Sequence, residues 1–122
     1  MFMADSALDA LLADVALATR TDICSQEPAT YTQATSTYSL GSYTSSSWGA
    51  VQDHSPTGRE RIRAAITTGA TVSVSGTATH FAETRPADSS LKVAQSLSNG
   101  QAVTSGNPFT LTACTVSVGD PV

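Results

Sequence analysis

An alternation of apolar and polar residues through 71–118 restricts the fold more than any other feature of the chain. Residues 71–75 alternate in this way, 109–118 form the longest such run, and 90–97 are the expected strand between them. Because successive side chains of a β-strand point to opposite faces, a period of two predicts strands with one buried face. We predict that these strands form a sheet against which the rest of the chain packs.

Short polar segments predict where these strands turn or bend. Asn99 and Gly100 suit a two-residue hairpin turn, whose central positions need positive φ angles. Residues 105–108, with the sequence Ser-Gly-Asn-Pro, predict a second turn. The apolar phase shifts by one residue after Cys114, where Val116 continues the pattern, and this shift predicts a β-bulge.

Residues 6–18 are the one segment with a helical periodicity. Apolar residues recur there at the i, i+3, i+4, i+7 spacing of one helix face, at Leu8, Leu11, Leu12 and Val15. Ser6 is the expected N-cap. A helix of about thirteen residues is marginal by itself, so it must pack on the domain's own sheet or on a neighbouring subunit. The three leucines are therefore candidate protein-interface residues.

The remaining segments complete a pattern of about seven short strands. Strands are expected at 21–25 and 60–67, a loop with strand pieces at 31–47, and a turn at 53–58. A spacing of roughly 8–12 residues between strands is typical of an antiparallel sandwich. We predict a mainly β fold, an antiparallel β-sandwich of jelly-roll or Ig-like type, with one short N-terminal α-helix and a sheet core at about 60–118.

The composition fits a single domain over 1–122 with few charges. Charged residues make up 13% of the chain, against a usual ~25%, and Ser and Thr occupy 35 positions. An uncharged polar surface suits strand faces, and it equally suits a surface that binds another protein. The net charge of −4 argues against nucleic acid and against an anionic membrane as partners.

The beginning of the chain lacks the pattern of a secretion signal. Asp5, Asp9 and Asp14 interrupt its apolar residues, and no basic residue precedes them. No stretch is long enough to span a bilayer. We expect synthesis in a cytoplasm, which favours reduced, buried thiols for Cys24 and Cys114. Their strands could be neighbours, and a disulfide between them is the alternative if the protein later meets an oxidising medium.

No catalytic or metal-binding motif stands out. Asp53, His54 and Ser55 place three catalytic residue types side by side, but triad members must converge from separate segments. A polar turn is therefore the better interpretation. A metal site needs three or four ligands, and those available are scattered along the chain: Cys24, His54, His80 and Cys114. We interpret His80 as a packed, hydrogen-bonded residue, and we expect no enzymatic activity, no metal and no cofactor.

Two groups of side chains are further candidates for a protein interface. Three arginines share one face of the strand expected at 60–67: Arg59, Arg61 and Arg63. They either pair across strands with acids such as Glu83 or Asp88, or they dock on an acidic neighbour. A second group contains the aromatic residues Tyr31, Tyr38, Tyr43 and Trp48. The tyrosines are expected to line an interface and Trp48 to lie in the core, and the alternative is a platform for glycan stacking.

These features occur in a particular order along the chain. A short amphipathic helix is followed by TDICSQEPAT, then by SWGAV, then by TVSVSGTATHFAE, and SLSNGQAVTSGNPFTLTACTVSV closes the pattern. This order resembles a family of small virion proteins of tailed phages and prophages. The similarity covers nearly the whole chain, and its most specific part is QAVTSGNPFTLTA at 101–113. The motifs are structural, so the resemblance carries over no catalytic residue.

The resemblance implies a head decoration protein, a head fibre protein or a small tail-associated module. Such proteins are assembled in the host cytoplasm and reside in the virion. The expectation is a non-enzymatic capsid decoration protein that binds the assembled lattice of the major capsid protein or another virion protein, as a homo-oligomer such as a trimer. The alternative is a tail or fibre module that binds a host surface glycan.

Overall fold

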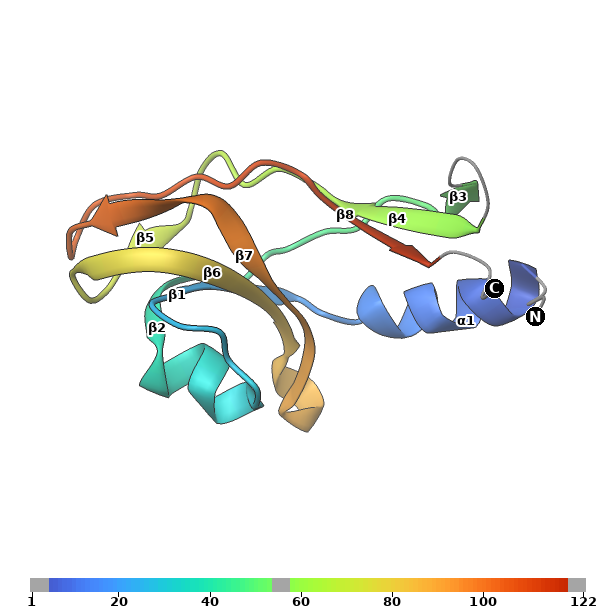
Figure 1. Ribbon diagram of the computed structural model, residues 1–122, viewed down its shortest axis with the longest axis horizontal. Helices are drawn as coiled ribbons and strands as arrows, with labels where there is room; N and C mark the ends of the chain where they lie inside the picture. Colours follow the sequence, from blue (N-terminus) through green and yellow to red (C-terminus); the bar gives the residue numbers. More distant parts are fainter. Residues whose placement is uncertain (1–4, 54–57, 119–122) are drawn as a thin grey trace.

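The structure is a computed structural model that describes residues 5–53 and 58–118. It is mainly β, with antiparallel sheets and one short α-helix, as the sequence predicts (Figure 1). In chain order the elements are α1 (Asp5–Val15), β1 (Arg20–Cys24), the π-helix η1 (Gln33–Thr37), β2 (Ser39–Tyr43), β3 (Gln52–Asp53), β4 (Arg59–Arg63), β5 (Thr71–Val72), β6 (Gly76–Arg85), the 3-10 helix η2 (Pro86–Asp88), β7 (Ser90–Val103) and β8 (Cys114–Val118).

Five strands form the larger sheet, in the order β5-β2-β1-β6-β7. Every neighbouring pair in it is antiparallel. β1 lies in the centre, where Ile23 stands opposite Gly41 of β2 and Phe81 of β6. This central place explains why four of the five residues of β1 are buried.

Three strands form the smaller sheet, in the order β3-β4-β8. β4 and β8 pair without interruption, from Arg59 opposite Val118 to Arg63 opposite Cys114. Helix α1 packs against β4 and β8. The molecule is therefore elongated, with the larger sheet and η1 at one end and the smaller sheet and α1 at the other (Figure 1).

An irregular ladder joins the two sheets. Beyond β4 and β8 the same two segments continue antiparallel, through bridges of Ile66 with Leu111 and of Thr71 with Pro108. The Ile66 and Leu111 backbones exchange two hydrogen bonds, of 2.9 and 3.0 Å. The two segments therefore stay paired at separate points as they pass from one sheet to the other.

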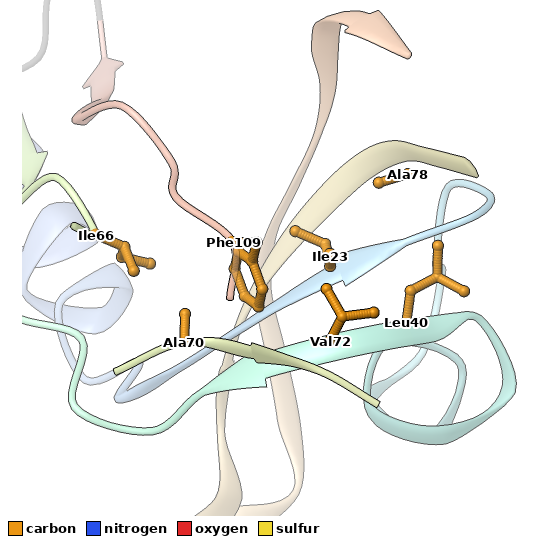
Figure 2. Close-up of a cluster of buried hydrophobic side chains, with 7 residues drawn as sticks. All are labelled: Ile23, Leu40, Ile66, Ala70, Val72, Ala78 and Phe109. Atoms are coloured by element: carbon orange, nitrogen blue, oxygen red, sulfur yellow. The ribbon is translucent and has the colours of Figure 1, made fainter. Parts of the chain in front are cut away.

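The main core lies between this ladder and the larger sheet (Figure 2). It consists of seven buried apolar side chains: Ile23, Leu40, Ile66, Ala70, Val72, Ala78 and Phe109. Ile66 and Phe109 come from the ladder, so the core holds two layers together. A smaller cluster of Cys24, Ala34 and Ala82 packs with Tyr38 and Leu91.

Helix α1 is shorter than the segment expected at 6–18. It spans Asp5–Val15, so Ser6 lies inside the helix and is not its N-cap. The N–H of Ala18 donates to the carbonyl of Val15, three residues back, at 3.1 Å. Such a bond closes a tighter final turn and partly satisfies the free carbonyls at the helix end.

Strand β7 runs straight through the hairpin turn predicted at 99–100, so that prediction is wrong. Ser96 pairs with His80, and Gln101 pairs with Ala78, which leaves four residues of β7 opposite one residue of β6. The Asn-Gly pair therefore lies in a bulge. Pairing with β6 on both sides of the bulge outweighs the local preference for a turn.

The longest alternating run, 109–118, is a regular strand only from Cys114 onward. Phe109 and Cys114 are both buried, so the predicted change of phase is confirmed. The predicted bulge at Cys114 is wrong, because β8 begins there and pairs evenly with β4. The turn predicted at 105–108 is confirmed, with Gly106 at a φ of 90°.

The two sheets are not closed on each other. Helix α1 packs on β4 and β8, and the larger sheet meets β4 chiefly through Arg63, which reaches Glu83 and Phe81 of β6. The loop expected at 31–47 contains η1 and β2, and the strand expected at 60–67 ends at Arg63. The turn expected at 53–58 falls mainly on 54–57, which lie outside the described residues.

Candidate functional site

Two of the three arginines of β4 bind neighbouring segments near the surface. Arg59 Nε lies 2.8 Å from Asp9 Oδ1 of α1, and its Nη1 lies 2.5 Å from Asp53 Oδ1 of β3. These hydrogen bonds, the one to Asp9 foremost, raise the pKa of Arg59. Arg61 Nε donates to the carbonyl of Gly49 at 2.6 Å. Both guanidinium groups are therefore engaged within the chain.

The third arginine, Arg63, forms a buried ion pair between the two sheets. Its Nε lies 2.5 Å from Glu83 Oε1 on β6, and the exposed side-chain fractions are 1% and 0%. Thr21 donates to the other carboxylate oxygen at 2.5 Å, and the guanidinium stands 5.4 Å from the centre of the Phe81 ring. Glu83 is thus one of the two acids predicted as partners, although the pair spans two sheets and not two neighbouring strands.

Opposing effects act on the pKa of the Glu83 carboxyl group. Burial raises its pKa to about 7, while Arg63 and the Thr21 hydroxyl act in the opposite direction. The nearby carboxylate of Asp22 adds to the rise. A carboxyl group with a pKa near neutrality can serve as a general acid or base, but this one is fully buried and engaged on both oxygens. We therefore assign it a structural role.

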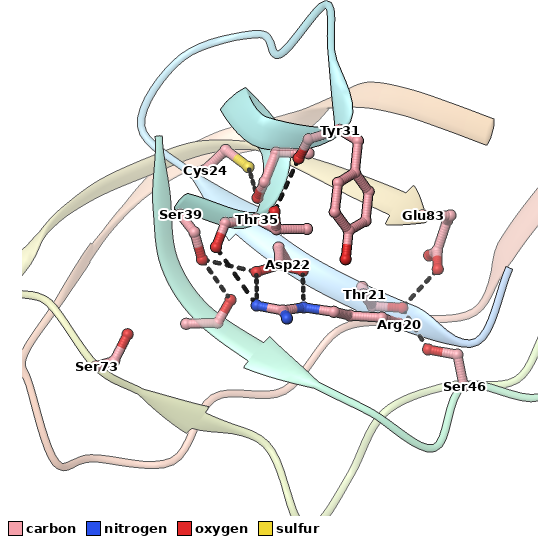
Figure 3. A network of polar contacts seen from close by, with 12 residues as sticks. Arg20, Thr21, Asp22, Cys24, Tyr31, Thr35, Ser39, Ser46, Ser73 and Glu83 are labelled. Carbon is pink, nitrogen blue, oxygen red and sulfur yellow. Dashed lines mark hydrogen bonds and ion pairs between the residues drawn. The ribbon is translucent and has the colours of Figure 1, made fainter. Parts of the chain in front are cut away.

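A second polar network ties β1 to β2 (Figure 3). Arg20 binds Asp22 through two bonds, Nε to Oδ1 at 2.7 Å and Nη2 to Oδ2 at 3.0 Å. Ser39 of β2 donates to the same carboxylate at 2.7 Å. Asp22 is fully buried, and its hydrogen bond raises the pKa of Arg20. This two-point geometry rigidifies the centre of the larger sheet.

The three candidate tyrosines do not gather at one place. Tyr38 packs against the Cys24 cluster, and Tyr43 packs against the main core. Tyr31 lies at the start of η1, near Arg20 (Figure 3). All three are partly exposed, and Trp48 is also partly exposed, with its indole N–H donating to the Ala18 carbonyl at 3.0 Å. The tyrosines therefore flank two different clusters.

The candidate leucines of α1 have different surroundings. Leu12 is 0% exposed and belongs to the core, whereas Leu11 is 50% exposed. The side chain of Leu8 lies outside those that the structure describes. Leu11 is therefore the described leucine of this group that can contact another molecule.

The histidines and cysteines form no metal site in the described chain. Across residues 5–53 and 58–118, no group of three or more His, Cys, Asp or Glu side chains is placed to hold a metal ion. His80 shares a hydrogen bond of 2.9 Å with Thr79, as expected for a packed histidine, and His54 lies outside the described residues. Cys24 and Cys114 are buried, unbonded and in different sheets, so the disulfide alternative is not realised. Burial raises the pKa of Cys24 to about 12.

A row of three hollows lies between β7 and residues 107–115, and we call it the β7 groove. The hollows measure about 320, 250 and 300 Å³, and neighbouring hollows share lining residues. Ile23 and Ala78 of the main core line the middle hollow. The rims carry uncharged polar side chains: Gln95, Ser98, Gln101, Asn107, Thr110 and Thr112.

The groove was not predicted from the sequence. Its floor is a part of the main core that neither layer covers fully, with Leu97, Val103 and Leu111 only partly buried. The sequence does contain a related signal, because the alternating segments on both sides of the 105–108 turn form the walls. That signal predicted a sheet and could not show that the walls stand apart.

Searches for similar proteins found no matching family model, no similar curated protein and no similar solved structure. In the described part of the chain, no helix is long and apolar enough to cross a membrane.

Proposed function

We propose that this chain is a structural protein of a tailed phage particle that acts by binding, not by catalysis, and specifically a capsid decoration protein. One observation carries the proposal. The segment with the most specific resemblance to that family, residues 101–113, supplies the end of β7, the turn and the facing wall of the β7 groove. The part of the sequence that suggests the family therefore also lines a recess that a partner could occupy.

The chemistry of the groove suits an extended polypeptide. The middle hollow, lined by Ile23 and Ala78, can accept apolar side chains of a partner, and the uncharged polar side chains of the rims can form hydrogen bonds without the cost of removing water from charges. β7 lies at the edge of its sheet, so its outer backbone groups are available to a bound strand. A strand bound there would extend the larger sheet beyond β7.

In this proposal the partner is the major capsid protein in its assembled, expanded lattice. A decoration protein that binds only this state stabilises it by mass action, because dissociation of the shell requires loss of the bound protein. Repeated copies at symmetry-related places of the lattice would add contacts between neighbouring capsid subunits.

The test is co-sedimentation with undecorated expanded capsids, followed by the melting temperature of the shell. We expect saturable binding at a fixed ratio to the capsid protein and a raised melting temperature. Thr112→Lys places a charge on an exposed residue that lines two hollows, and it should weaken binding at least about ten-fold. Thr37→Lys makes the same change at an exposed position of η1 and should bind normally.

Arg61→Glu separates this proposal from docking through the arginines of β4. We expect normal binding from this variant, because Arg61 lies on the smaller sheet and not on the groove. Loss of binding with Arg61→Glu and not with Thr112→Lys would move the interface to β4. If the unmodified chain does not bind capsids, the decoration function is wrong, and glycan binding becomes the hypothesis to test.

A further inference from the structure

Strand β8 has an open edge. It pairs with β4 on one side, and none of the described strands pairs with its other side. Its antiparallel ladder with β4 is regular along all five residues, so its free backbone groups follow the regular alternation that another antiparallel strand needs. β7, in contrast, is interrupted by register shifts. β8 is therefore the better formed of the two edges.

The open edge also lacks the features that normally prevent strands from pairing. Natural edge strands are protected by charged residues, proline, bulges or extreme shortness. The sequence Cys-Thr-Val-Ser-Val of β8 contains no charge and no proline, and Thr and Val are residues that favour strands. Another strand can therefore pair with this edge without meeting a charge.

A second copy of the same edge is a complementary partner. Two antiparallel copies of one strand pair around a two-fold axis perpendicular to the sheet, which keeps each side chain on its original face. With Val116 in the middle of β8, Val116 lies opposite Val116 of the second copy. Thr115 then lies opposite Ser117 of the second copy, and no like charges meet.

Helix α1 supports the same arrangement. Asp9 binds Arg59 on β4, and Leu11 lies two residues further along the helix. Two residues correspond to about 200° of rotation, so Leu11 lies on the opposite flank, away from the bond to β4. Because α1 contacts β8 as well as β4, the rotation away from Arg59 places this flank toward β8 in the proposed arrangement.

The spacing of strands would bring the two helices into contact. Strands lie about 4.8 Å apart, so helices packed over β4 and β8 in each copy would lie about 10 Å from each other. Packed helices are about 8–10 Å apart. Leu11 would then be covered by the other helix. Asp9 and Asp14 form ion pairs with Arg59 and Lys92, which reduces repulsion between the helices, although Asp53 shares Arg59.

We propose that two copies of this chain associate through antiparallel pairing of β8 with β8, centred on Val116, with the two α1 helices side by side on one face of a six-stranded sheet. The proposal concerns the free protein and does not depend on binding to a capsid.

The test is sedimentation of the purified chain over a range of concentrations. We expect a dimer. A double substitution, Thr115→Glu with Ser117→Glu, opposes carboxylates across the two-fold axis at positions that are exposed in the single chain. It should raise the dissociation constant at least about ten-fold. The control, Ser36→Glu with Thr37→Glu, adds the same charge at exposed positions of η1 and should leave the dimer intact.

A charge-swap experiment tests the register. The Thr115→Glu, Ser117→Glu chain is mixed with a Thr115→Lys, Ser117→Lys chain. If residue 115 lies opposite residue 117 of the second copy, each chain is weakly self-associating and the mixture forms a heterodimer. Circular dichroism checks that both variants fold.

Three results would overturn the proposal: a monomer even at millimolar concentration, an oligomer that the paired glutamates do not weaken, or a trimer. Cys114 and Thr115 also line one hollow of the β7 groove, so capsid binding is measured separately and with the unmodified chain. Conversely, a β8 dimer in a chain that does not bind capsids would leave this inference standing and remove the decoration function.

Discussion

The carboxyl group of Glu83 is buried and lies beside the guanidinium group of Arg63. The loss of water outweighs the Arg63 and Thr21 contacts, and the pKa rises from its usual 4.5 to about 7. The folded chain therefore holds this proton more tightly than the unfolded chain does. Linkage then makes the contribution of Glu83 to stability fully present below pH 4.5 and progressively lost as the pH rises through about 7.

Glu83→Gln should remove this pH dependence. A glutamine does not titrate, so the variant should lack a component of up to about 1.4 kcal/mol per pH unit over this interval. The measurement is urea unfolding of both proteins at several pH values, with the difference in unfolding free energy plotted against pH. Parallel profiles for the two proteins would show that the folded pKa of Glu83 is not raised.

At the scale of elements, backbone proximity decides where β2 and β5 meet. A Cβ on Gly41 would stand 2.6 Å from the Thr71 carbonyl oxygen and 2.9 Å from the Val72 Cα. Both are backbone atoms, so a side chain at this position forces the strands apart. β5 has only two residues, and it has little other pairing with which to compensate.

Gly41→Ala should destabilise the chain by about 1–3 kcal/mol, the usual cost of overpacking. Gly49→Ala is the matched control, because its nearest neighbour would be the Ile62 carbonyl oxygen at an ordinary 3.6 Å. The control should change stability by less than about 0.5 kcal/mol. Urea denaturation measures both, and equal effects would contradict the argument from close approach.

At the scale of the whole molecule, two connections between the sheets stand beside the main core. One is the irregular ladder through Ile66 and Leu111, and the other is the buried pair of Arg63 and Glu83. The pair lies deep between the sheets, where an unpaired charge is costly. Its two members come from β4 and β6, so it acts only when both sheets are in place.

Above pH 7, where Glu83 is ionised, Arg63→Met should therefore cost about 3–5 kcal/mol, because it leaves the buried carboxylate without its cation. Arg61→Met removes a guanidinium from the same strand that is only partly buried, and it should cost about 0–1 kcal/mol. Thermal and urea unfolding compare the two variants. A loss at Arg63 as small as that at Arg61 would mean that the ion pair does not couple the sheets.

Much of the local structure follows from the sequence. The alternation around Val72 and Val116 and the amphipathic pattern around Leu12 predicted strands and a helix near their observed places, because each pattern reflects one buried face. The turn at Gly106 was also predictable, since its residue types favour turns locally. The chain's sparse charge likewise comes from the sequence, and the phage virion role remains a proposal.

Contacts between segments far apart in the chain could be seen only in the tertiary structure. The Asn-Gly pair at 99–100 became a bulge because β6 pairs on both sides of it, and the arginines of β4 found partners on three different elements. The β7 groove and the open edge of β8 arise because the two sheets share one ladder and do not close. The period of the hydrophobic pattern and the composition indicate which face of a segment is buried. Which segments face each other depends on packing that spans the whole chain.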